Sequence, residues 1–170
     1  LQAYGIVPWH VAIMTRRLTK AFEDEDANRI LYLSADLGHY IADAHVPLHT
    51  TENYNGQLTG QKGIHGLWES RIPELTASEY DYLVGRATYI KSPLNAIWDA
   101  VEESHSYLDS VLYIEKELSR QMPSDQKYAF EQRGRSTVRQ YSQQFALAYY
   151  NRMGDMVESR MRKSIVMVGC

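Results

Sequence analysis

Two pairs of side chains, each pair spaced by four residues, constrain this chain more than any other feature. His39 and Asp43 form the first pair, His65 and Glu69 form the second, and His49 lies between them. On a helix, residues i and i+4 lie one turn apart on the same face. The sequence therefore favours two helices, each of which directs an imidazole and a carboxylate toward one point.

Imidazole nitrogen combined with carboxylate oxygen is a ligand set that suits zinc better than the hard, oxygen-preferring cations. A His–Asp pair on one helix can also be a hydrogen-bonded pair in a core, and for His39 and Asp43 alone this interpretation stays open. The same spacing recurs at His65 and Glu69, with His49 between the pairs. That recurrence favours a metal site.

Composition limits the remaining possibilities only loosely. The 170 residues correspond to one domain with a sizeable core. A net charge of −3 gives no basic footprint and argues against avid binding to duplex nucleic acid. Apolar runs are too short to span a membrane, and the single cysteine, Cys170, excludes an internal disulfide.

Both ends of the sequence suggest a piece of a longer protein. The chain opens at Leu1 without Met or a signal-like segment, and it closes within a helical pattern. We therefore expect residues 1–170 to be a single helical domain whose N-terminal part is missing.

Apolar spacing predicts helices through most of the chain and no strand, and so an all-α, multi-helix bundle. The predicted helices are one from Pro8 through Phe22, one from about Ala27 to His45, a short one with His65 and Glu69, a weakly patterned one over Tyr80–Tyr89, one from Pro93 to Met122, and one from about Ser136 onward. Residues 50–63 are rich in Gly and Asn and predict a loop.

The five candidate ligands divide into two groups. His49 follows Pro47 and can turn toward the short helix, so that His49, His65 and Glu69 supply three protein ligands. Three ligands leave a coordination position open, which is typical of catalytic zinc; structural zinc is closed by four. His39 and Asp43 supply two ligands and need partners from elsewhere.

The stretch HYIADAHVPLH, followed by HGLWE, resembles the superfamily of zinc-dependent phospholipases C and S1/P1 nucleases. These enzymes use H-x3-D-x5-H followed by a second H-x3-[ED]. The resemblance covers roughly residues 1–75. Glu69 and the short interval from His49 to His65 are more similar to the phospholipases, because the nucleases carry Asp and a longer interval.

The resemblance implies three zinc ions in the intact enzyme. His39 would bind one ion, and Asp43 would bridge it to a second, which makes Asp43 the expected catalytic carboxylate. His49, His65 and Glu69 would hold the third. The family's other ligands would lie before Leu1, so we expect about one Zn²⁺ in this chain. Asn55 matches a position at which the phospholipases contact substrate.

The expected function is a zinc-dependent phosphodiesterase resembling bacterial phospholipase C, with an S1/P1-like single-strand nuclease as the alternative. The substrate would be a phospholipid headgroup or single-stranded nucleic acid; no protein partner is evident. From a different class, a non-catalytic helical module stabilised by zinc stays open, as does an inactive remnant of the enzyme. The resemblance implies a secreted or periplasmic protein.

Overall fold

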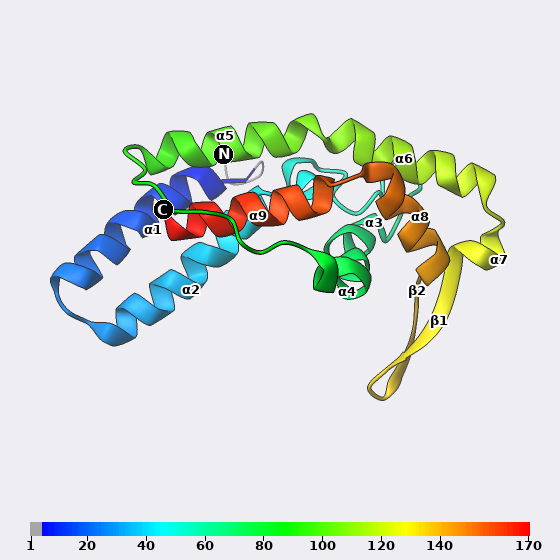
Figure 1. Cartoon of the computed structure of the whole chain (residues 1–170), viewed down its shortest axis with the longest axis horizontal. Helices are drawn as coiled ribbons and strands as arrows, with labels where there is room; N and C mark the ends of the chain where they lie inside the picture. Colours follow the sequence, from blue (N-terminus) through cyan, green and yellow to red (C-terminus); the bar gives the residue numbers. More distant parts are fainter. Residues whose placement is uncertain (1–4) are drawn as a thin grey trace.

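The computed structural model describes residues 5–170, apart from the side chain of Arg133; residues 1–4 of the predicted domain lie outside the described part. The chain is mostly helical and carries one small β-hairpin (Figure 1). In chain order the elements are α1 (Val7–Glu23), α2 (Ala27–Ala44), the 3-10 helix η2 (Pro47–Thr50), α3 (Ile64–Gly66), the π-helical η3 (Leu67–Arg71), α4 (Ile72–Thr76), the 3-10 helix η4 (Ala77–Glu79), α5 (Pro93–Ser106), α6 (Leu108–Gln121), α7 (Ser124–Lys127), β1 (Tyr128–Arg133), β2 (Ser136–Tyr141), α8 (Gln143–Met153) and α9 (Met156–Gly169).

The helices form an elongated body whose two ends project to the same side (Figure 1). Helices α5 and α6 follow one another along one edge. The α1–α2 pair forms one projecting end, the β1–β2 hairpin forms the other, and α9 crosses the space between them. The candidate ligands lie in the segment from α2 to α4, which connects the two ends.

Local signals explain where the helices of this segment begin and end. Asp26 caps α2 by accepting a hydrogen bond from the backbone N–H of Arg29 at 3.1 Å. Pro47 follows the end of α2 and opens η2, as expected for a residue that suits the first turn of a helix but lacks an N–H.

Two buried clusters hold the ligand segment in place. The smaller one packs Val11 of α1 and Ile41 of α2 against Ile97 of α5. The larger one joins η2, the α3–α4 helix, α6 and α8; its fully or almost fully buried members include Leu48, Ile64, Leu67, Ile72, Val111, Phe145 and Tyr149. The elements that carry the candidate ligands are therefore part of the core.

The hairpin corrects the expectation of a strand-free chain and of a helix from about Ser136. Strands β1 and β2 pair antiparallel, with Tyr128 opposite Tyr141 and Arg133 opposite Ser136. Gly134 takes a φ of +61° in the connecting turn, where a β-carbon would be strained. Spacing of three between Val138 and Tyr141 suggested a helix, but aromatic and β-branched residues also favour strands.

Three further differences concern helix boundaries. The segment 80–91 is not helical, although the buried ring of Tyr80 anchors its start. The helix predicted from Pro93 to Met122 is interrupted at Tyr107, between α5 and α6. The last helix is divided at Gly154, whose φ of +64° disfavours any other residue.

A buried ion-pair network joins the loop 51–63, the hairpin and α6. The carboxylate of Glu115, on α6, is fully buried and lies 2.8 Å from Lys127 Nζ. It accepts hydrogen bonds from Gln61 of the loop at 2.6 Å and from the Tyr141 hydroxyl of β2 at 2.9 Å. Burial raises the pKa of Glu115, but Lys127, Gln61 and Ser119 more than offset this effect, so that its pKa is lowered overall.

Candidate metal centre

His49 is presented by η2, immediately after α2. Pro47 and Leu48 are buried and fix this short helix against the core, whereas the ring of His49 stays partly exposed. The backbone N–H of His49 donates to the carbonyl of Val46 at 3.1 Å. The sequence VPLH thus combines a buried anchor with an outward-facing imidazole.

His65 and Glu69 lie on a short helix with an unusual middle. The helix starts after Gly63, which has a φ of +102°, and it widens into a π-helical turn at Leu67–Arg71. Pro73 accounts for the widening, because it has no N–H to donate to the Glu69 carbonyl and its ring would crowd that carbonyl in a regular helix. Such π-helical turns frequently occur at functional sites.

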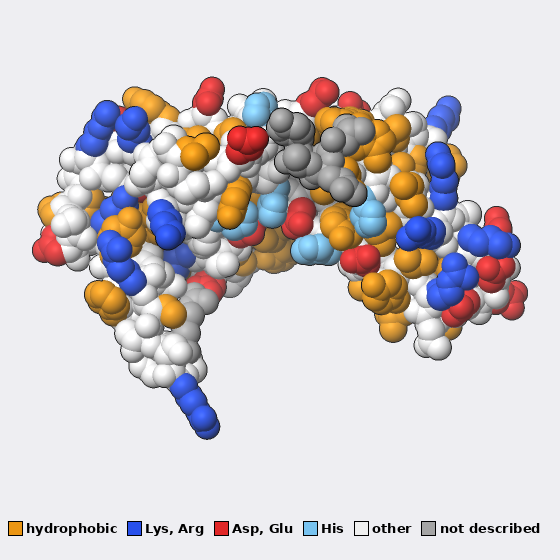
Figure 2. All heavy atoms as spheres, turned by 180° about the vertical axis from the view of Figure 1, so that it is seen from behind, with side chains coloured by type: hydrophobic (Ala, Val, Ile, Leu, Met, Phe, Trp, Pro, Cys, Tyr) orange, Lys and Arg blue, Asp and Glu red, His pale blue; other side chains and the backbone are white. Residues whose placement is uncertain are grey.

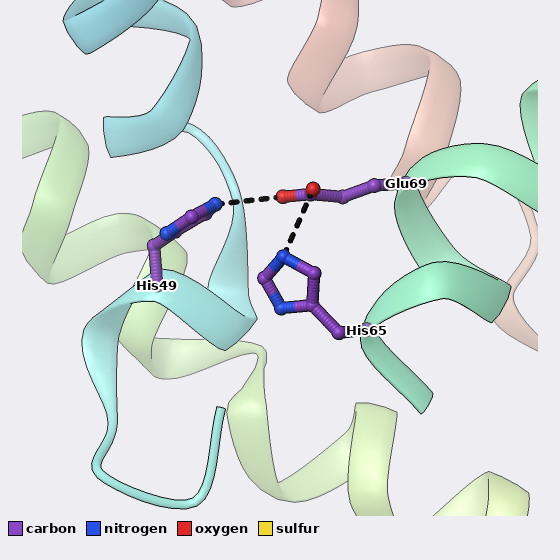
Figure 3. Close-up of side chains that lie close together, drawn as sticks. All are labelled: His49, His65 and Glu69. Carbon is purple, nitrogen blue, oxygen red and sulfur yellow. Dashed lines mark ion pairs between the residues drawn. The ribbon is translucent and has the colours of Figure 1, made fainter. Parts of the chain in front are cut away.

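The three side chains converge on one point (Figure 3). His49 Nε2 lies 2.9 Å from Glu69 Oε1, and His65 Nε2 lies 3.0 Å from Glu69 Oε2. One ligand atom from each residue falls within 4.8 Å of the other two. Zinc with bonds of about 2.0–2.2 Å would separate its ligand atoms by about 3.4 Å in a tetrahedral site. Small side-chain adjustments would therefore suffice to surround an ion.

The ring of His65 is oriented by its second nitrogen. Nδ1 lies 3.1 Å from the backbone carbonyl of Tyr54; a carbonyl can only accept, so Nδ1 carries the proton. Nε2 then faces Glu69 as a potential ligand. A backbone carbonyl bound to the distal nitrogen is the usual support of a metal-binding histidine. The Glu69 carboxylate raises the pKa of His65, as expected for an imidazole beside a negative charge.

Glu69 bears the strongest electrostatic signature of the site. Burial raises its pKa, but the His49 and His65 rings outweigh that effect and lower the pKa of Glu69 to about 2. Its Oε1 is buried and receives no well-oriented hydrogen bond from the described residues, although His49 Nε2 is close. A buried anionic oxygen without a hydrogen-bond donor is suited to binding a cation, so the donor set of His49, His65 and Glu69 fits a metal ion such as zinc.

Asp43 lies between this group and His39. Its Oδ2 is 3.4 Å from His39 Nε2, and its Oδ1 is 3.8 Å from His49 Nε2. The structure thus brings the five predicted ligands into one row, but only His49, His65 and Glu69 form a compact three-residue group among the described residues. Their roles as metal ligands, and the catalytic role of Asp43, remain predictions.

Two large clefts flank the imidazoles of the three-residue group, and a smaller one of about 230 Å³ lies on the Glu69 side. The cleft beside His65 has a volume of about 780 Å³ and runs between the loop 51–63 and the hairpin. The cleft beside His49 measures about 700 Å³ and is lined by Trp9, Trp98, Glu52 and Glu102, among others. Figure 2 shows several histidine side chains across the middle of this face, above the hollow between the two projecting ends, and another at the opposite edge.

Asn55, the predicted substrate contact, lines the cleft beside His65. Its side-chain oxygen accepts a hydrogen bond from the Gly63 N–H at 2.9 Å, so it also shapes the loop. Its role toward substrate remains a prediction.

Sequence reasoning missed the Tyr54 carbonyl, and no side-chain signal could have revealed it, because the group belongs to the backbone. It also assigned no role to His105, whose Nδ1 lies 3.0 Å from Thr50 Oγ1 in the cleft beside His49.

Comparison with known proteins identifies no relative: no protein-family model, no curated protein and no solved structure matches this chain. Within the described residues, the helices are too short or too polar to cross a membrane.

Proposed function

We propose that this protein is a zinc-dependent hydrolase of phosphodiesters. The observation that carries the proposal is the convergence of His49, His65 and Glu69, in which the distal nitrogen of His65 is already bound to the Tyr54 carbonyl. A metal ion held here would supply the positive charge that polarises a phosphodiester and acidifies a nearby water.

The residues of the chain itself would perform the other tasks. The Tyr54 carbonyl fixes the ring of His65, and the core packing of Pro47 and Leu48 fixes His49. Asp43, with one oxygen toward His39 and the other toward His49, would link this ion to a neighbouring one. The partly exposed group lies at the junction of two clefts, so a substrate can reach it from either side.

Two substrate classes remain, and different observations favour each. Glu69 and the short interval between His49 and His65 favour headgroup release from a phospholipid, because both features are similar to the zinc-dependent phospholipases C that the sequence resembles. The cationic lining of the cleft beside His65 favours single-stranded nucleic acid. Assays on phosphatidylcholine and on single-stranded DNA, with and without a chelator, decide between them.

The decisive experiment for the proposed activity compares Glu69→Gln with Glu74→Gln, a nearby exposed carboxylate on α4. We expect zinc-dependent hydrolysis of bis(4-nitrophenyl) phosphate by the wild type and by Glu74→Gln, and at least a tenfold loss in Glu69→Gln. Zinc binding that raises the melting temperature without any phosphodiester hydrolysis would favour the non-catalytic module instead.

A further inference from the structure

The cleft beside His65 has a cationic lining, although the chain as a whole carries a net charge of −3. Its lining residues include three cations, Lys62, Arg71 and Arg139, and no Asp or Glu. The cleft beside His49 has the opposite character, with Glu52 and Glu102 and neither Lys nor Arg among its lining residues. The candidate metal centre therefore lies between a cationic and an acidic cleft.

Arg71 serves the architecture of the cleft. It is buried, and its guanidinium forms a forked ion pair with Glu131 of β1, including a contact of 3.2 Å from Nη1. Gln140 of β2 donates to the same carboxylate at 2.6 Å. These contacts fix the hairpin against η3, the helix turn that carries Glu69, so the distance between hairpin and metal centre is set by the fold.

Lys62 and Arg139 are the cations available to a ligand. Both are exposed, and neither forms an ion pair with a described carboxylate within 4.0 Å. The Arg139 guanidinium lies 3.8 Å from the centre of the Tyr128 ring, which leaves its N–H groups free to donate. Tyr54, with 54% of its surface exposed, adds a second aromatic face beside His65.

We propose that Lys62 and Arg139 form a second anion subsite, which binds a further phosphate of a single-stranded nucleic acid whose first phosphate lies at the metal centre. This inference rests on the proposed function, because the first phosphate is placed at His49, His65 and Glu69. Cations combined with aromatic faces suit a strand that alternates phosphates with planar bases. The acidic cleft beside His49 repels phosphates, so the strand extends from the metal centre toward the hairpin rather than toward Glu52 and Glu102.

The test measures binding separately from hydrolysis. Fluorescein-labelled hexathymidylate is titrated with protein in EDTA, and anisotropy gives the dissociation constant. Arg139→Ala should weaken binding about fivefold. It should also reduce the slope of log affinity against log salt concentration by about 0.7, the value that corresponds to the loss of one phosphate contact on a single strand. Arg139→Lys should recover part of the affinity, because it keeps the charge. Arg135→Ala is the matched control, since it removes an exposed cation from the same hairpin outside the cleft.

The outcomes separate this inference from the proposed function. Equal affinities of Arg139→Ala and Arg135→Ala, or no binding by the wild type at millimolar protein, would overturn the subsite. Capture by phosphatidylglycerol vesicles without hexathymidylate binding would overturn its assignment to a nucleic acid. Weaker hexathymidylate binding by Arg139→Ala than by Arg135→Ala, together with no hydrolysis of any phosphodiester in the presence of zinc, would support the subsite and reject the proposed hydrolase.

Discussion

At the scale of single residues, the carboxylates of Glu69 and Asp43 differ in which imidazoles they contact. Glu69 contacts two imidazoles of one compact group, whereas Asp43 lies between His39 and His49. The first arrangement would hold one ion, and the second would link two. Substitution by the uncharged amide therefore distinguishes the two roles.

We predict that Asp43→Asn lowers kcat at least tenfold more than Glu69→Gln at zinc concentrations high enough to fill a second, weaker site beside Asp43 as well as the tight site at His49, His65 and Glu69. Loss of a bridging charge disturbs the spacing of two ions, whereas Glu69→Gln leaves one ion with two histidines. Steady-state kinetics on bis(4-nitrophenyl) phosphate, with zinc content measured in parallel, test this. Equal or reversed losses would remove the bridging role from Asp43.

At the scale of elements, the loop 51–63 positions the Tyr54 carbonyl behind His65. Gly56 sits at its tightest point: a β-carbon there would lie 2.4 Å from the backbone oxygen of Gln61, and φ is +70°. Gly60 has a similar φ of +76° but open space around it. The two glycines thus share backbone strain and differ in steric crowding.

We predict that Gly56→Ala lowers the free energy of unfolding by about 1–3 kcal/mol more than Gly60→Ala, because only the first forces the loop apart. Gly56→Ala should also weaken zinc binding, since a displaced loop no longer orients His65. Urea unfolding and zinc titration calorimetry measure the two effects. Similar behaviour of both variants would show that backbone strain alone matters here.

Helix α6 holds this loop and the hairpin through Glu115. The pKa of Glu115 is lowered in the folded state, so its ionisation stabilises the fold above its unfolded pKa of about 4.5, and this contribution is lost as the pH falls below that value.

We predict that Glu115→Gln lowers the free energy of unfolding by about 3–5 kcal/mol at pH 7, because Lys127 loses its buried partner. The deficit should shrink below pH 4.5. Glu117→Gln, on the same helix but paired near the surface, is the control in urea unfolding measured across pH.

At the scale of the whole molecule, Arg160 of α9 ties together elements that are distant in sequence. Its guanidinium is buried and donates to the carbonyls of His45 at 3.0 Å and Ala100 at 3.0 Å, and to Ser104 Oγ at 2.6 Å. These contacts join α9 to the end of α2 and to α5. The turn that leads to His49 is thereby anchored from the opposite end of the chain.

We predict that Arg160→Met destabilises the protein by about 3–5 kcal/mol, because the buried carbonyls of His45 and Ala100 lose their charged donor and Glu103 keeps only Lys163 as a partner. Arg162→Met, in a largely exposed pair with Asp81, should change the free energy by less than about 1 kcal/mol. Urea unfolding of both variants tests this. A small effect of Arg160→Met would mean that α9 is held by apolar packing alone.

The purified chain should bind about one zinc ion tightly, since only one compact three-ligand group exists among the described residues. Elemental analysis after growth in zinc-replete medium measures this. Zinc-free protein would contradict the ligand assignment, and three tightly held ions would require ligands beyond those recognised here.

Much of the fold and of the candidate centre follows from the sequence, because the information is local. Spacing of four within helices places His39 beside Asp43 and His65 beside Glu69. Pro8 and Pro93 mark the predicted helix starts through the chemistry of the backbone, and the helical character of the chain follows from apolar periodicity.

What only the tertiary structure decided depends on contacts between distant residues. The hairpin forms where a helix was expected, since Tyr141 pairs with Tyr128 and reaches Glu115 on another helix. The meeting of His49 with Glu69, the Tyr54 carbonyl behind His65, and the cations placed beside them all result from packing between segments. The residue types that a metal site requires are thus encoded locally, whereas their convergence is decided by the core that joins η2, α6 and the π-helical turn.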